Sequence, residues 1–292
     1  GAIVDNVKMI QTSCVATAVD WMASATENEE GAMTLVVNLT DETNTGATYT
    51  VAYKASEETA YTEVAGLTID DFPYSISEGI AHQTTYDVQV SLLCAGEEET
   101  LDLGTQTLTT PCAAIPFPWF EDFTTNPYNT ACWGKYSGGM PSNGVIATAD
   151  LSTSTSSYAW GYSVGFSCGT TTSNMLRSEL YGTSGYKYWS ITPVIDLGND
   201  GTAKQIAFDL GLRSYNSNAA PANSPDDRVM ILVSLDNGTT WNMANGLIFA
   251  DGDDDTEHNY SDLGLQMQRY VYRLVNENDE PLTGQVRFAF YS

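Results

Sequence analysis

Basic residues are scarce in this sequence of 292 residues: 11 lysines and arginines stand against 37 aspartates and glutamates, for a net charge of −26. Such a charge repels the phosphates of nucleic acids and anionic membrane surfaces, so we expect no nucleic-acid partner. No apolar run approaches the roughly 20 residues of a membrane-spanning helix, and we expect no membrane insertion. The start, Gly1-Ala2-Ile3-Val4-Asp5, lacks the basic and apolar segments of a signal peptide, so we expect any such peptide to have been removed.

Cysteine pairs of the C-x-x-C type are also missing, although the chain has five cysteines. Their absence argues against a zinc site or thioredoxin-like chemistry. Two disulfides with one cysteine left over are typical of a secreted protein in an oxidising compartment. The alternative is five buried thiols in a cytosolic protein.

Helical periodicity is almost absent, and short strand patterns take its place. Residues 33–39 form one such run, residues 47–53 alternate polar and apolar side chains, and residues 86–92 alternate in the same way. Glycine, asparagine, aspartate and proline separate these runs. The pattern predicts an all-β protein built as a sandwich or barrel.

The first part of the chain, residues 9–112, resembles a fibronectin type III domain. Residues 33–39 are similar to the family's strand B, Tyr49-Thr50-Val51-Ala52-Tyr53 to its Y-x-V-x-Y strand C, and residues 79–90 to its L-x-P-x-T-x-Y-x-V-x-V segment. The chain departs from the family at Leu39, where no tryptophan ends the strand, and at His82, which replaces a proline. The resemblance implies a sandwich in which the hydroxyl of Tyr86 bonds to nearby backbone, the tyrosine corner.

The resemblance also implies a disulfide. In a fibronectin-type sandwich, the first strand begins at the pole where the strand of Tyr86 ends. Cys14 lies at the first place and Cys94 at the second, so we expect them to be bonded. Cys112 and Cys132 flank the opening strand of the next domain and form the expected second pair, which leaves Cys168 free.

Residues 111–123 mark a boundary, because three prolines within eight residues prevent regular structure and give a short stiff linker. The remainder, residues 113–292, resembles the MAM-like jelly roll called cleaved adhesin or choice-of-anchor J. The match rests on an F-x-E-D-F opening at 117–123, a W-L-x-T-P-x-I-D-L stretch at 188–197, and a D-x-x-x-V-x-V-S-x-D-G-G-x-T-W stretch at 227–241. Such modules follow fibronectin-type domains in secreted bacterial surface proteins, including gingipain adhesin regions.

Residues 1–8 carry a pattern that the jelly roll lacks at its end. The family closes with a strand reading roughly I-D-N-V, whereas this chain stops at Phe290-Tyr291-Ser292 and opens with Ile3-Val4-Asp5-Asn6-Val7. We expect residues 1–8 to be a stray jelly-roll strand, left over from a preceding module or donated to cover an open edge. Donation between neighbouring copies would build chains of subunits.

Catalytic motifs are weak. The two histidines, His82 and His258, fall in a turn and in an acidic loop, and the G-x-S-x-G match at 165–169 has no strand–turn–helix context. Carboxylate pairs for glycoside hydrolysis stay open because acidic residues are abundant. The resembled modules bind and link, so we expect a protein that is not an enzyme.

Calcium is the expected cofactor, in a structural role. The segment 251–257 holds five carboxylates in seven residues, with Asp251, Asp253 and Asp255 at alternate positions. Calcium prefers six to eight such oxygens, although a solvated run of charges would have the same sequence. By resemblance, Glu121 and Asp5 form a second candidate site.

Aromatic residues give the candidate ligand site. Trp189 and Trp241 lie in strand motifs and are expected in the core. Tyr158, Trp160 and Tyr162 follow a Ser/Thr-rich loop, where exposed rings stack on sugar faces; Trp133 is a weaker candidate. The alternative is that these rings also fill the core.

These features predict a non-enzymatic adhesin-type protein, secreted or on a bacterial cell surface. The jelly roll would bind a glycan or a host or matrix protein, and the fibronectin-like domain would act as a spacer. The alternatives are a structural spacer or assembly subunit of a larger surface protein, and an accessory module of a secreted hydrolase.

Overall fold

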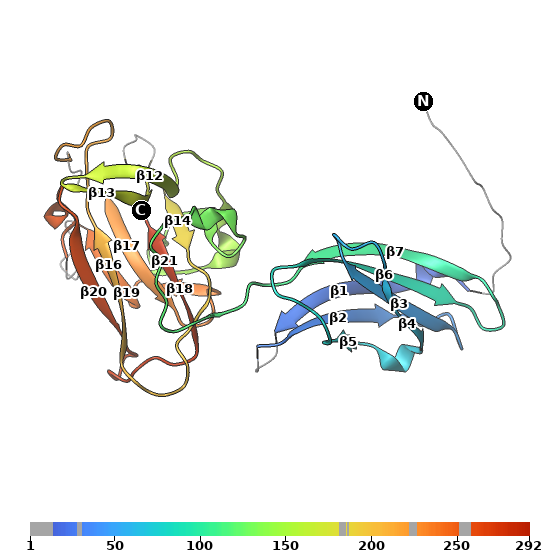
Figure 1. Cartoon of the computed structure of the whole chain (residues 1–292). Helices are drawn as coiled ribbons and strands as arrows, with labels where there is room; N and C mark the ends of the chain where they lie inside the picture. The colour runs from blue at the N-terminus through green and yellow to red at the C-terminus, as the bar shows by residue number, and fades with distance from the viewer. Residues whose placement is uncertain (1–13, 28–30, 181–184, 186, 222–226, 251–257) are drawn as a thin grey trace, which may run out of the picture. The chain divides into compact units, whose positions relative to one another are not determined.

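Strands make up almost all of the regular structure. The computed structural model describes residues 14–27, 31–180, 185, 187–221, 227–250 and 258–292, and an all-β fold is confirmed there (Figure 1). The helical elements of these residues are 3₁₀ turns of three residues each: η1 (Ala16–Ala18), η2 (Ile69–Asp71), η3 (Pro127–Asn129), η4 (Thr148–Asp150) and η5 (Tyr260–Asp262). None of the helices in this described part is long and apolar enough to span a membrane.

The chain divides into two compact units, Gly1–Ala113 and Ala114–Ser292. The division falls one residue beyond the boundary expected from the proline-rich segment. We describe each unit by itself.

The first unit has a three-stranded and a four-stranded antiparallel sheet around one core. The smaller sheet has the order β1 (Asp20–Glu27), β2 (Met33–Thr40), β5 (Tyr74–Ile76), and the larger the order β4 (Thr62–Leu67), β3 (Thr48–Ala55), β6 (Thr85–Leu93), β7 (Thr100–Thr109). The three predicted strands are therefore confirmed as β2, β3 and β6. Burial alternates along β2 and β6 because one face of each strand packs inward. The fully buried apolar residues of these two strands include Leu35, Val37, Val88, Val90 and Leu92.

Two side chains at one edge connect the sheets of this unit. The indole nitrogen of Trp21 on β1 donates to the carbonyl of Leu103 on β7 at 3.0 Å. The amide of Gln106 on β7 accepts from the backbone nitrogen of Ala23 at 3.0 Å and donates to the carbonyl of Trp21 at 2.9 Å. β1 is an edge strand, so its outer backbone groups have no strand partner within the sheet. The bonds to Gln106 satisfy two of these groups.

Tyr86 forms the expected corner. Its hydroxyl accepts a hydrogen bond from the backbone nitrogen of Ala81 at 2.9 Å and donates to the carbonyl of Gly79 at 3.5 Å. The turn before β6 is thus fastened to the strand that it leads into.

The cysteines pair as expected. Cys14 and Cys94 are bonded, with their Cα atoms 5.6 Å apart. Cys112 and Cys132 each take part in a disulfide, and Cys168 is free and buried. The prediction of two disulfides and one free cysteine is confirmed.

Replacing Cys14 and Cys94 together by alanine is expected to destabilise the first unit by about 4 kcal/mol, because the bond closes a loop of 80 residues. Hydrogen exchange of the β2 and β6 amides in increasing urea measures the loss. The control is Cys168→Ala, which removes a buried thiol without opening a loop and should leave these amides unchanged. An equal protection pattern in the double variant and the parent would contradict the prediction.

The second unit has one large sheet with smaller pairs of strands beside it. The main path runs β11 (Ser152–Thr153), β9 (Gly134–Ser137), β14 (Tyr188–Ile191), β21 (Gln285–Tyr291), β15 (Ile195–Asp196), β8 (Ile115–Pro116), and β17 (Arg228–Ser234) joins β21 to β19 (Gly246–Ala250). The separate pairs are β10 (Val145–Ala147) with β18 (Thr240–Asn242), β12 (Gly161–Cys168) with β13 (Thr171–Arg177), and β16 (Lys204–Leu210) with β20 (Gln268–Leu274).

β21 lies in the middle of the large sheet (Figure 1). It pairs with β14 and β15 and also with β17, so both of its edges are used. The last strand of the chain is therefore an inner strand of the sheet. The open edge that a missing closing strand of the jelly roll would leave elsewhere stays a prediction. Residues 1–8 lie outside the described residues, and strand exchange through them stays a prediction.

Both faces of this sheet are covered. One face packs Met230, Leu232 and Ala289 with Trp189 and Trp241, which are fully buried as expected. The other face carries Ile231, Val233 and Phe288 against residues of β16 and β20. Double-sided burial explains why β17 is apolar throughout instead of alternating.

The turn between β17 and β18 is built around Asp236. Its carboxylate accepts hydrogen bonds from the hydroxyl of Ser234 at 2.6 Å, from the backbone nitrogen of Thr240 at 2.9 Å and from the hydroxyl of Thr240 at 2.6 Å. Burial opposes ionisation of Asp236, but the bonds from Ser234 and Thr240 outweigh it and lower the pKa of the carboxyl below its ordinary value of 3.8.

Asp236→Asn is expected to destabilise the second unit by about 1 kcal/mol at pH 7, since this exposed carboxylate loses its charge-assisted bonds. A lowered folded-state pKa means that the contribution is complete above pH 3.8 and is lost as the pH falls through the folded-state value. The gap between parent and variant, measured by urea denaturation from pH 7 to pH 2.5, should therefore close below pH 4. A gap independent of pH would contradict this account.

Candidate functional site

The candidate site lies on the β12–β13 hairpin of the second unit. Gly161 pairs with Arg177 and Ser163 with Met175, but the next pair is Phe166 with Ser173, so a bulge at 164–165 interrupts the register. Gly165 takes a φ of +57°, which a residue with a side chain rarely adopts. Paired residues of antiparallel strands share a face, so the extra residue turns Phe166 onto the face that carries Ser163 and Arg177.

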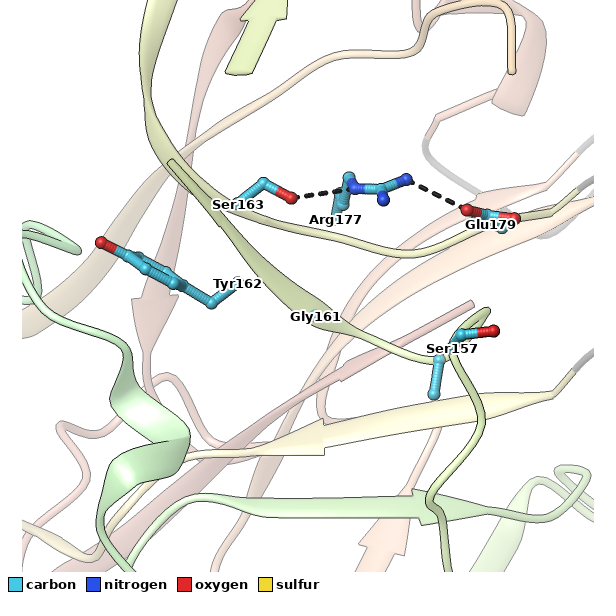
Figure 2. A pocket seen from close by; sticks show the side chains of 7 residues that line it. Ser157, Gly161, Tyr162, Ser163, Arg177 and Glu179 are labelled. Atoms are coloured by element: carbon cyan, nitrogen blue, oxygen red, sulfur yellow. Dashed lines mark hydrogen bonds and ion pairs between the residues drawn. The ribbon is translucent and has the colours of Figure 1, made fainter. Parts of the chain in front are cut away.

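Arg177 is the centre of this face. Its Nε donates to the hydroxyl of Ser163 at 2.9 Å and its Nη1 to Oε1 of Glu179 at 3.0 Å. The other carboxylate oxygen of Glu179 is buried and has no hydrogen-bond partner among the described residues. Figure 2 shows Ser163, Arg177 and Glu179 in a row, with the Tyr162 side chain pointing away from them.

Two adjoining hollows share Arg177 and Glu179. One has a volume of about 130 Å³, and its other lining residues are Ser157, Ala159, Gly161, Tyr162 and Ser163 (Figure 2). The second has a volume of about 260 Å³, and its other lining residues are Phe166, Arg213, Tyr215 and Asn216. We call the two together the hairpin cleft.

Guanidinium groups cover the ring of Phe166. The guanidinium carbon of Arg177 lies 5.2 Å from the ring centroid and that of Arg213 lies 4.4 Å from it. Nη1 of Arg213 donates to the carbonyl of Ser167 at 2.7 Å and Nε to that of Ser214 at 3.3 Å. The ring and these two carbonyls hold Arg213 in place, and the ring, Ser163 and Glu179 hold Arg177.

Two exposed tyrosines lie at or beside the cleft. Tyr215 lines the second hollow and is 46% exposed. Tyr158 lines neither hollow, but it is 40% exposed and interacts electrostatically with Tyr215. The carbonyl of Tyr158 accepts from the backbone nitrogen of Glu179 at 3.0 Å. This bond continues the backbone pairing of the hairpin to residue 158. The negative charge of Glu179 raises the pKa of the Tyr215 hydroxyl above its ordinary value.

The sequence-predicted rings have different surroundings. Tyr158 is exposed beside the cleft, whereas Trp160 is only 8% exposed, in agreement with the alternative that this ring fills the core. Its ring packs against Phe290, 6.0 Å away between centroids, because β12 lies on the large sheet at this point. Its indole nitrogen has no hydrogen-bond partner among the described residues.

The other two predicted rings support the loop before β9. The hydroxyl of Tyr162 donates to the carbonyls of Phe123 and Thr124 at 3.1 and 3.4 Å, although this residue also lines the cleft. Trp133 is buried and packs beside Trp119, Phe123 and Tyr128. A ligand-binding role for these residues stays a prediction.

The predicted calcium ligands fall mainly outside the described residues, which do not include Asp5, Asp251, Asp253 or Asp255. Glu121 is described; it lies in no strand, and its Oε1 accepts from the backbone nitrogen of Phe123 at 2.8 Å. Within the part that the structure describes, no group of three or more histidine, cysteine, aspartate or glutamate side chains is arranged to hold a metal ion. Structural calcium stays a prediction.

Sequence reasoning missed Arg177, Glu179, Arg213 and Tyr215. Arg177 ends β13 and Glu179 follows it by two residues, so continuing the alternation of that strand would have placed both on one face. The approach of Arg213 to Phe166 joins residues far apart in the chain, and no local pattern indicates it.

Comparisons of the chain with protein-family models, with curated proteins and with solved structures found no match.

Gly165→Ala is expected to destabilise the second unit by about 1 kcal/mol, because alanine is strained at positive φ. A Cβ at Gly165 meets no atom within 4 Å, so the strain is in the backbone alone. Gly161→Ala on the same strand is the control: its φ is ordinary and its added Cβ would lie 3.6 Å from the nearest atom. Equal urea midpoints for the two variants would contradict the role of the bulge.

Proposed function

We propose that the second unit binds glycans at the hairpin cleft, as a non-enzymatic adhesin-type module of a secreted or cell-surface protein. The observation that carries this proposal is the placement of two exposed tyrosines beside the fixed Arg177–Glu179 pair. Aromatic faces stack on the apolar faces of sugar rings, and paired donors and acceptors bind neighbouring hydroxyl groups.

The chemistry of Glu179 supports the proposal. Its buried free oxygen requires a donor, and a sugar hydroxyl would supply one. Arg177 lies beside this oxygen. Its Nε and Nη1 are fixed by Ser163 and Glu179, so its remaining N–H groups are held ready to donate to a ligand. A fixed acceptor and a fixed donor side by side would set the orientation of the bound sugar, which ring stacking alone would leave free.

The first unit is proposed as a spacer of fibronectin type III kind. The arrangement of three and four strands around one core and the corner formed by Tyr86 support that resemblance. The disulfides support an extracellular location, because such bonds persist in oxidising compartments.

A glycan array tests the binding proposal. The unmodified chain is expected to bind a subset of glycans, and Tyr158→Ala with Tyr215→Ala is expected to weaken that binding by about tenfold or more, since each lost stacking ring contributes about 1 kcal/mol. The control is Phe120→Ala, which removes a ring that is 84% exposed and lies outside the cleft. Absence of binding to every glycan, or equal loss in the control, would overturn the proposal.

A further inference from the structure

We propose that the ligand of the hairpin cleft is an acidic glycan, and that Arg213 binds the carboxylate of its sialic or uronic acid. This inference rests on the proposed function, because it names the ligand class of the same cleft. The observation behind it is a guanidinium group in the cleft that has no carboxylate partner among the residues that the structure describes.

Arg213 is held in place without being neutralised. It is half-buried, it lies over the ring of Phe166, and its protein hydrogen bonds go to two backbone carbonyls. Those bonds use Nε and Nη1, and Nη2 has no acceptor among the described residues. A ligand anion would meet a donor whose position is already fixed, which reduces the entropy lost on binding.

Four other basic side chains of this unit have carboxylate partners. Arg269 forms two bonds to Asp209, Arg273 pairs with Asp279, and Lys204 pairs with Asp200. Arg177 is paired with Glu179 inside the cleft itself. No described carboxylate pairs with Arg213, and the same holds for Lys135 and Arg287, but of these three Arg213 alone lines the hairpin cleft.

The charges within the cleft favour a single negative charge on the ligand. Arg177 and Glu179 cancel each other, so Arg213 contributes the one net positive charge among the described lining residues. Glu179 repels a doubly charged phosphate about twice as strongly as a carboxylate, and a carboxylate also matches the single charge and planar donors of a guanidinium. Tyr215 and Asn216 line the same hollow and face the rest of the sugar.

The first test needs no variant of the protein. An array carries sialylated and uronic-acid glycans, each beside the same glycan with its carboxyl group methyl-esterified, together with sulfated and neutral glycans. The parent is expected to bind free acids about tenfold or more tightly than their esters, because the ester loses one charged hydrogen bond. The preference should weaken as salt is raised, since exposed charges are screened.

The second test removes the guanidinium. Arg213→Gln is expected to bind the acids and their esters equally, at the level at which the parent binds the esters. Arg269→Gln, which removes an exposed arginine on β20, should keep the preference of the parent. Melting curves of both variants show whether the second unit remains folded, and the ester comparison in the parent stands even where Arg213→Gln does not fold.

The outcomes separate this inference from the proposed function. Equal binding of acids and esters by the parent would overturn the inference and leave glycan binding intact, as would a preference for sulfated glycans. A preference for acids that survives in folded Arg213→Gln would overturn the role of Arg213. No binding to any glycan would overturn the proposed function and this inference with it.

Discussion

The contact between Trp160 and Phe290 connects the candidate site to the core of the second unit. Phe290 is a residue of β21, which lies in the middle of the large sheet, and its ring also touches Phe208 on β16. Leu176 of β13 packs into the same cluster, and the hydroxyls of Ser178 and Ser292 are 2.6 Å apart. The inner face of the hairpin is thereby fixed, and the alternation of the strands directs Arg177 and Glu179 outward.

The bulge in β12 decides what this outward face contains. Without the extra residue, Phe166 would point inward with Tyr162 and the arginines would lack the ring that they cover. A single glycine at positive φ thus determines whether the cleft has an aromatic base. The site is a local property of the hairpin, supported by a core contact and completed by Arg213 from another segment.

The strands of the first unit could be predicted from the sequence because one face of each strand is exposed to water and the other is buried. Polar and apolar residues therefore alternate along them. β2 and β6 are examples, and Tyr86 and the Cys14–Cys94 bond followed from the order of those strands. The sequence leaves open whether Trp160 is exposed or buried, because its neighbour Phe290 is 130 residues away and the segment around Trp160 is rich in serine and threonine. Arg213 was overlooked for the same reason, since its ring partner comes from a different part of the chain.

The position of β21 has a consequence for synthesis on the ribosome. The strand lies between β14 and β17 but is translated long after both, so the large sheet cannot close until residues 285–291 have emerged. At about 5–20 residues per second, the edges of β14 and β17 remain unpaired for several seconds. The wait is shorter in the first unit, where β3 at residues 48–55 pairs with β6 at residues 85–93. The protein is therefore expected to need protection from aggregation for longest in its second unit, during an interval set by the speed of translation.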